Sequence, residues 1–395
     1  MTVKKRRPMP APPKATKMLF RKRLKVGFIL DLHLGHNPFD NKQATAEDMR
    51  VAYQQSLLEQ LRYLHGKGCD VVAFGGDTFD TPHPDNEDIA MLISALACYP
   101  KFKYYFIPGN HEIESNHIHA LTTLMAVSKI SKISITVVRL CEAHMINGFP
   151  VTFMGYPFTH PNFDDPGLIV MHNEFRGAKR DNGSIFEKGE EFSSERAEKL
   201  NQLYVSGHLH TYQRIGKEIG GYAEPGHRRL SSGRIYFGRL GGMRHEAGDF
   251  DIAGIVTMTK EKGQYVYDIE NYSISPFWII QAKRYANRSE FLDHMNWVLE
   301  SGVHLNLISI RVKADSPYIP TPEELGKSDL YRFVTIEAKK SAYDELQEQM
   351  NDNEAGRQTK NIGTYMDDWL DRISSAKLRG FALNRFEQLR KKIGG

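Results

Sequence analysis

Six short apolar runs constrain the fold of this chain more than any other feature. Each run is followed by a polar turn that contains or soon reaches a glycine. Nearly every position within a run is apolar, and this lack of alternation is typical of strands that are covered on both faces. The runs occupy residues 26–30, 71–74, 104–107, 151–154, 168–171 and 203–205.

Helical patterns separate the first of these strands. Residues 46–64 carry an apolar stripe at helical spacing, and residues 87–97 form a second, shorter helical stretch. An order of strand, helix and strand favours a mixed α/β architecture.

Asp, Asn or His side chains follow five of the six runs. In open α/β sheets, ligands bind just outside the carboxyl ends of the strands, so loops that follow different strands can meet at one site. The candidate site residues are Asp31, His33, Asp77, Asn110, His111, His172, His208 and His210.

These residue types fit a centre that binds two metal ions. Carboxylate, imidazole and amide oxygen without thiolate suit manganese, iron, zinc or magnesium. Alternate side chains of an extended segment point to the same side, so both members of Asp31-Leu32-His33 or of His208-Leu209-His210 can reach one metal cluster. Any one of these motifs is common, and it is the ordered set of five that makes the prediction specific.

The ordered set resembles the calcineurin-like metallophosphoesterases over residues 31–210. The resemblance implies two packed mixed β-sheets flanked by helices. It also implies that Asp31, His33, Asp77 and His210 hold one metal ion, while Asp77, Asn110, His172 and His208 hold the other. Two divalent ions are expected, manganese first, with magnesium, iron or zinc as alternatives.

The resemblance gives His111 a different role from the seven ligands. In the family, the histidine at this position lies beside the scissile phosphate and protonates the leaving oxygen or stabilises its charge, and Glu112 would orient it. The implied reaction is attack on phosphorus by a water molecule that the two metal ions activate.

Two of the motifs, at residues 31–35 and 76–81, resemble the forms found in SbcD-type DNA repair exonucleases. This implies a metal-dependent DNA exonuclease or endonuclease, with DNA and a coiled-coil ATPase of the SbcC type as partners, in a homodimeric DNA end-processing and repair complex. Eukaryotic and archaeal relatives carry a histidine three residues after the bridging aspartate. Here that position is Asp80, as in the bacterial type, which puts a second acting histidine in doubt.

Four segments are expected along the chain. Residues 1–24 form a basic tail, residues 25–272 the phosphoesterase domain, residues 276–345 a smaller α+β domain, and residues 346–395 an amphipathic helical region. By the same resemblance, the α+β domain would cap the DNA and the helical region would bind the ATPase.

Charge is distributed unevenly, although the net charge is only +4. The first 25 residues hold ten Lys or Arg and no acid, which leaves the rest of the chain at a net charge of −6. The tail either contacts nucleic acid phosphates or an acidic partner, or is a solvated leader. An acidic body argues mildly against tight DNA binding by this chain alone.

Three widely spaced cysteines form neither a zinc pattern nor a disulfide framework, which suits a reducing compartment. No apolar run approaches the roughly 18 residues that a membrane-spanning helix needs. We therefore expect a soluble cytoplasmic protein with no membrane partner.

Two other functions remain compatible with the sequence. A phosphodiesterase or phosphatase acting on a small or protein-bound phosphate ester would need the same metal ligands. A non-catalytic binding module that keeps the fold is disfavoured, because every metal position and His111 are filled.

Overall fold

The computed structural model describes residues 23–39, 44–114, 119–156, 164–175, 177–179, 184–186, 194–210, 212–218, 227–237, 253–327 and 330–337. Contacts divide the chain into Met1–Glu337 and Ala338–Gly395, and all described residues belong to the first unit. The predicted helical region at residues 346–395 and nearly all of the predicted basic tail therefore lie outside the described residues.

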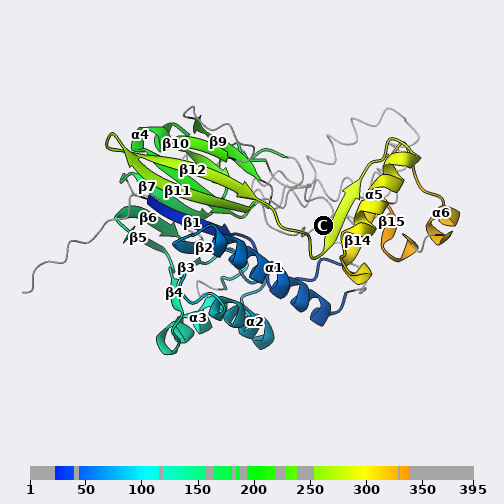
Figure 1. Ribbon diagram of the computed structural model, residues 1–395, viewed down its shortest axis with the longest axis horizontal. Coiled ribbons are helices and arrows are strands. Elements are labelled where there is room, and N and C mark those ends of the chain that lie inside the picture. Colours follow the sequence, from blue (N-terminus) through cyan, green and yellow to red (C-terminus); the bar gives the residue numbers. More distant parts are fainter. Residues whose placement is uncertain are drawn as a thin grey trace, which may run out of the picture. The chain divides into compact units, whose positions relative to one another are not determined.

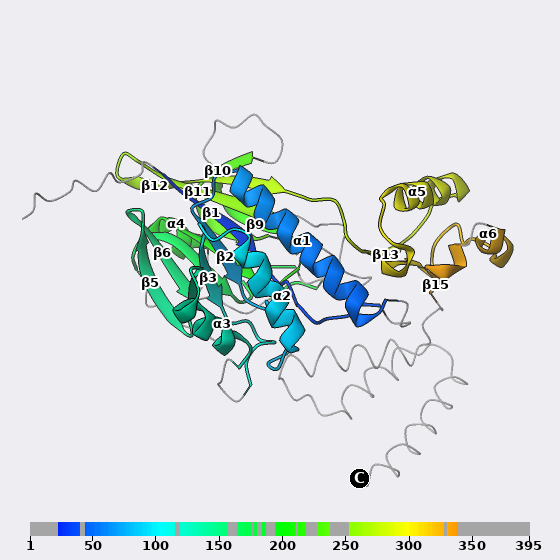
Figure 2. The ribbon, with the colours of Figure 1, turned by 60° about the horizontal axis from the view of Figure 1, so that its bottom comes forward.

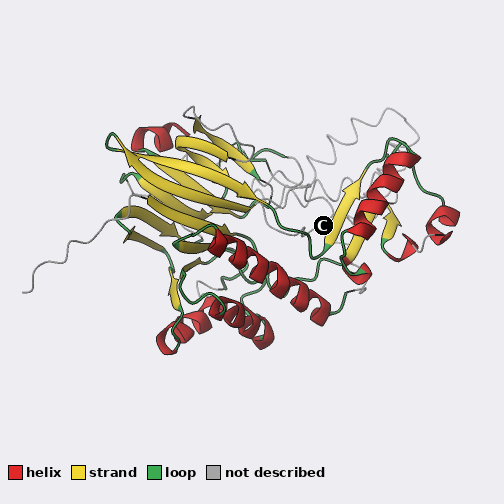
Figure 3. Ribbon diagram, viewed as in Figure 1, coloured by secondary structure: helices red, strands yellow, loops and turns green. Residues whose placement is uncertain are grey.

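One large sheet of 12 strands forms the centre of the described chain, in the order β4-β3-β2-β1-β11-β12-β10-β8-β7-β6-β5, with β9 paired to β10 (Figures 1 and 3). Its first half comprises β1 (Arg23–Ile29), β2 (Val71–Gly75), β3 (Lys103–Ile107), β4 (Ser134–Val137), β11 (Ala253–Glu261) and β12 (Gln264–Tyr272). Its second half comprises β5 (Cys141–Ile146), β6 (Phe149–Met154), β7 (Gly167–His172), β8 (Gln202–Gly207) and β9 (Gln213–Glu218).

Strand β10 (His227–Tyr236) joins the two halves. Its first residues pair antiparallel with β12, from His227 opposite Glu270 to Leu230 opposite Tyr267. Its last residues pair parallel with β8 instead, from Gly233 opposite Leu203 to Tyr236 opposite Ser206, and its register with β9 shifts between Leu230 and Ser232. The two packed sheets expected from the sequence are thus joined by hydrogen bonds into one sheet, which folds over on itself.

The central strands pack against apolar clusters on both of their faces, which explains why the apolar runs show no alternation with polar residues. In β1, Val26 and Phe28 belong to an apolar cluster that also contains residues of β6, β7 and β8, so this cluster fills the space between the two halves. Ile29 belongs to a different cluster, which packs against the helices. Both faces of the central strands are therefore buried.

Helices cover the outer faces of the folded sheet. On the first half lie α1 (Ala46–Gly66), α2 (Asn86–Ala97) and α3 (His119–Ile130), with α1 beside α2 in Figure 2. On the second half, α4 (Ser194–Leu200) contributes Ala197 to a cluster with residues of β7 and β8. The layer order is helix, sheet, sheet and helix.

A second, three-stranded parallel sheet follows β12. It pairs β13 (Ile279–Lys283) with β14 (Ile308–Val312) and β14 with β15 (Val334–Ile336). Its apolar cluster contains Phe291, Met295 and Val298 of α5 (Arg288–Glu300). The remaining elements of this part are α6 (Pro322–Lys327) and two short 3-10 turns, Leu305–Leu307 and Leu330–Arg332.

Among the described residues, no helix is both long and apolar enough to cross a membrane.

Candidate metal centre

The predicted site residues lie at the carboxyl ends of five strands. Asp31 and His33 follow β1, Asp77 follows β2, and Asn110 and His111 follow β3. In the other half of the sheet, His172 is the last residue of β7, and His208 and His210 follow β8. Because these strands are parallel within each half, their carboxyl ends meet at one edge of the folded sheet.

Hydrogen bonds join the loops of the two halves. The backbone N–H of His208 donates to Asp31 Oδ1 at 2.7 Å, and His172 Nδ1 donates to the carbonyl oxygen of Gly75 at 2.9 Å. The site therefore depends on the sheet folding over, because neither half supplies all of its residues.

The structure brings the seven predicted ligands together. Ligand atoms of Asp31, His33 and His210 lie within 4.8 Å of one another, and so do those of Asp77, His172 and His208. Asn110 completes the set, because its Oδ1 lies 3.1 Å from His172 Nε2 and 2.9 Å from His208 Nδ1.

Asp77 lies between the two groups. Its Oδ2 is 3.2 Å from His172 Nε2 in one group and 3.7 Å from His33 Nε2 in the other. This is the position that a carboxylate shared by two cations would occupy.

The backbone at four of these residues is left-handed, although none of them is glycine. The φ angles are 49° at Asp31, 47° at His33, 48° at Asp77 and 85° at His208. Each such residue costs on the order of 1–3 kcal/mol, and this strain persists only where the surroundings hold it, as in many functional sites.

Two glycines permit the close approach of the loops. A Cβ at Gly76 would lie 2.2 Å from His172 Nδ1, and one at Gly109 would lie 2.0 Å from Asp77 Oδ1. Neither position can carry a side chain without displacing a candidate ligand. The glycines beside the motif residues are therefore part of the site.

The electrostatic field of the cluster favours positive charge. Burial alone would lower the pKa of His172, but the charge of Asp77 and its hydrogen bond raise this pKa to about 9. Burial alone would raise the pKa of Asp77, but the charge of His172 and its hydrogen bond hold the pKa well below its usual range. The same field that stabilises a proton on His172 Nε2 also favours a metal cation at that atom.

A buried carboxylate oxygen indicates that the cluster suits metal ions. Asp31 is fully buried, and its Oδ2 has no hydrogen-bond partner among the residues that the structure describes. Such an atom is costly unless a cation or a donor satisfies it. Together with the imidazoles and the amide oxygen, the donor set fits two divalent cations of the manganese, iron, zinc or magnesium type.

Asp80 contacts the candidate ligand His33 on the side of its ring away from the metal site, a role that was not predicted from the sequence. Its Oδ1 lies 3.0 Å from His33 Nδ1, and its Oδ2 lies 3.0 Å from His36 Nδ1. Burial opposes the ionised form, but the hydrogen bonds from His33 and His36 hold the pKa of Asp80 well below its usual range. A carboxylate at Nδ1 fixes the tautomer of His33 so that Nε2 faces the metal site.

We expect Asp80→Ala to lower the affinity for divalent metal by about 10–100-fold, because His33 loses the partner that orients its ring. Titration of the chelator-treated, desalted protein with Mn²⁺ measures this affinity. Asp85→Ala is the matched control, since Asp85 is an exposed acid whose side chain makes no capping bond to α2. Equal Mn²⁺ affinity in both variants would contradict a supporting role for Asp80.

His111 is at the surface of the same cluster. Its ring centroid lies 4.8 Å from that of His33, and its side chain is 38% exposed, whereas His33 is buried. Its Nδ1 lies 3.0 Å from the main-chain oxygen of Asp80. A carbonyl oxygen only accepts, so Nδ1 carries a proton and Nε2 is the atom left to act on a substrate.

The predicted role of Glu112 in orienting His111 is wrong. Glu112 is fully buried, and its two carboxylate oxygens accept the backbone N–H groups of Phe79 at 3.1 Å and Gly109 at 2.8 Å. Burial and the charge of Asp77 raise the pKa of Glu112 to about 8 despite these two bonds. Glu112 therefore ties the loop after β3 to the loop after β2.

We expect Glu112→Ala to lower the free energy of unfolding by about 2–5 kcal/mol, because two backbone donors are left buried without an acceptor. Urea unfolding followed by circular dichroism measures this loss. Glu114→Ala is the control, since Glu114 is exposed and pairs with the exposed His83. A loss of stability no larger than in the control would show that these loops do not depend on Glu112.

Residues 24–212 match the family described as calcineurin-like phosphoesterase. No protein with curated annotation matches the sequence.

Two solved structures are similar to parts of the chain. A nuclease MPE from Pseudomonas putida is 15% identical, with a TM-score of 0.26 over 52% of this chain and 84% of its own. A dimetal phosphatase from Danio rerio is 11% identical, with a TM-score of 0.39 over 63% of this chain and 98% of its own.

Proposed function

The chain contains a calcineurin-like phosphoesterase domain over residues 24–212, and we propose that it is a DNA nuclease dependent on two divalent cations. The observation that carries this proposal is the convergence of all seven candidate ligands at the edge of the folded sheet. The architecture, a large curled sheet flanked by helices, is that of the calcineurin-like metallophosphoesterase fold.

Each cation would have its own set of ligands. One set comprises Asp31, His33, Asp77 and His210, and the other comprises Asp77, Asn110, His172 and His208. Two divalent cations, when bound, lower the pKa of water and neutralise charge on the attacking and leaving oxygens of a phosphate ester. Manganese is the first choice among the ions that fit this donor set.

Asp80 and His111 have separate roles beside these ligands. Asp80 holds the His33 ring and so keeps Nε2 directed at the metal site. His111 presents Nε2 at the accessible side of the cluster, because its Nδ1 proton is engaged by the carbonyl oxygen of Asp80. A doubly protonated His111 would supply the proton that the leaving oxygen needs.

Two features support DNA as the substrate. Residues 31–35 and 76–81 resemble the versions of these motifs in SbcD-type nucleases, including Asp80 in place of histidine. In addition, the sheet β13–β14–β15 with α5 follows the phosphoesterase part, in the region where those nucleases carry a domain that caps DNA.

A substrate comparison tests the proposal. Linear double-stranded DNA and a chromogenic phosphodiester are incubated with the protein and Mn²⁺, and Asp77→Asn serves as the inactive control. We expect metal-dependent cleavage of the DNA. Cleavage of the small ester alone, across all Mn²⁺ concentrations, would favour a phosphodiesterase or phosphatase of small or protein-bound esters, a function that the acidic body of the chain also suits.

The proposed partners are a second copy of this chain and a coiled-coil ATPase that binds residues 346–395. We expect deletion of residues 346–395 to abolish co-purification of this ATPase and to leave hydrolysis of the chromogenic ester unchanged. Retention of the ATPase by the truncated chain would place its binding site elsewhere.

A further inference from the structure

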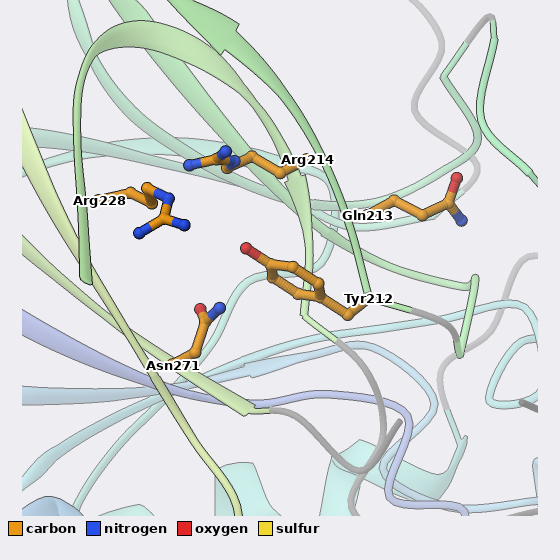
Figure 4. Close-up of a pocket in the computed structure, with 5 residues that line it drawn as sticks. All are labelled: Tyr212, Gln213, Arg214, Arg228 and Asn271. Atoms are coloured by element: carbon orange, nitrogen blue, oxygen red, sulfur yellow. The ribbon is translucent and has the colours of Figure 1, made fainter. Parts of the chain in front are cut away.

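A pocket of about 340 Å³ lies among strands β9, β10 and β12 (Figure 4). None of the seven candidate ligands lines it. Its described lining residues are Tyr212, Gln213, Arg214, Arg228 and Asn271.

Strand register explains why these polar residues meet. Arg214 of β9 is opposite Ile235, and Arg228 of β10 is opposite Ile269. Both isoleucines belong to the apolar cluster that fills the space between the two halves of the sheet. Cross-strand partners share a face, and so do residues two apart on one strand. Arg214, Arg228 and Asn271 therefore continue the inner face of the sheet where its apolar cluster ends.

The side chains are arranged around one space. Figure 4 shows the guanidinium groups of Arg214 and Arg228, the phenol of Tyr212 and the amide of Asn271 turned toward a common centre. Gln213 points away, and its amide bonds to the backbone of Lys179 instead. The pocket thus presents two cationic groups, a hydroxyl and an amide.

The charge of this pocket indicates an anionic ligand. Two guanidinium groups line it, and none of its described lining residues is acidic. Guanidinium is the side chain that pairs best with phosphate oxygens, because its planar fork of N–H donors matches two of them at once. Asn271 adds a buried Oδ1 with no hydrogen-bond partner among the described residues, which a donor on a ligand would satisfy.

We propose that this pocket binds a phosphate group, either as free phosphate or on a nucleic acid strand, and does so independently of the metal cluster. Donors that come from three different strands and from the segment before β9 surround a tetrahedral oxyanion better than a planar carboxylate. The volume exceeds what a single phosphate ion needs, so the pocket also accommodates the group that carries the phosphate. This site goes beyond the proposed function, because it requires neither metal ions nor cleavage.

Calorimetric titration of the full-length chain tests the proposal. Metal is removed by chelator treatment and desalting, so that phosphate cannot bind at the metal cluster. Three probes are compared: inorganic phosphate, a 5′-phosphorylated oligonucleotide and the same oligonucleotide with a 5′-hydroxyl. The variants are Arg214→Gln with Arg228→Gln, the corresponding double Lys variant, and Arg229→Gln. Arg229 is the matched control, since it neighbours Arg228 but pairs with Glu261 and Asp268.

We expect the metal-depleted wild-type chain to bind at least one of the probes. The double Gln variant should bind at least about tenfold more weakly, the double Lys variant should be intermediate, and Arg229→Gln should match the wild type. Preference for the 5′-phosphorylated oligonucleotide identifies a terminal phosphate, equal binding of both oligonucleotides identifies the backbone, and binding of inorganic phosphate alone identifies the free ion. Absence of binding by the wild type, or equal binding by the folded double Gln variant, would overturn the proposal.

Discussion

Asp77→Asn is expected to lower phosphodiester hydrolysis to the background of the assay and to reduce the bound metal below two ions per chain. Asp77 Oδ2 faces His172 of one ligand group and His33 of the other. An amide is neutral and offers a single oxygen, so it cannot neutralise two cations as a shared carboxylate does. Metal content after desalting, together with hydrolysis of a chromogenic phosphodiester, measures both effects.

Asn is preferred to Ala here because Asp77 also has a structural contact. Its Oδ1 accepts the backbone N–H of His111 at 2.9 Å, and the Asn amide oxygen can keep this bond. Asp85→Asn is the control for a change of one negative charge at an exposed position. If Asp77→Asn retained two ions per chain and near wild-type hydrolysis, Asp77 would not bridge the centre.

The strands that carry the site could be predicted from the sequence because they are buried on both faces. The apolar run at residues 71–74 became β2, and the run at residues 168–171 became β7, each within about one residue at either end. The polar residues after these runs converge because parallel strands end at one edge.

The order of the strands in the sheet could not be predicted in the same way. Strand β11 lies between β1 and β12, although more than 200 residues separate β1 from β11 along the chain. Such pairing depends on tertiary packing, for which a local pattern holds no information. The pairing of β10 with both halves of the sheet likewise depends on tertiary packing.

Within the site, the ligand types were predicted but the groups that support them were not. The left-handed backbone of Asp31, His33 and Asp77 has no sequence signal, since L-residues other than glycine rarely adopt it. Asp80 lies three residues after Asp77, but this spacing alone does not indicate that its carboxylate bonds to His33. Glu112 adjoins His111 in the sequence, whereas its side chain turns to the backbone of Phe79 and Gly109.

His111→Gln is expected to leave both metal ions bound and to lower kcat by about 10²–10⁴-fold, the range for loss of a positioned general acid. The alternative is that His111 is itself a metal ligand, because potential ligand atoms of His111, His33 and Asp77 lie within 4.8 Å of one another. Two observations favour the acid. Its side chain is 38% exposed, unlike the buried His33, and its Nδ1 donates to a main-chain oxygen, which leaves Nε2 accessible to a substrate.

The two roles of His111 give opposite results in a pair of measurements. For a general acid, metal content is unchanged, and the kcat of His111→Gln recovers most with an ester whose leaving group is acidic enough to depart without a proton. For a ligand, metal content falls and the loss is equal for all leaving groups. His36→Gln is the matched control, since His36 also contacts Asp80 but belongs to none of the three groups of potential metal ligands. The leaving-group dependence therefore decides whether His111 acts on the substrate or on the metal.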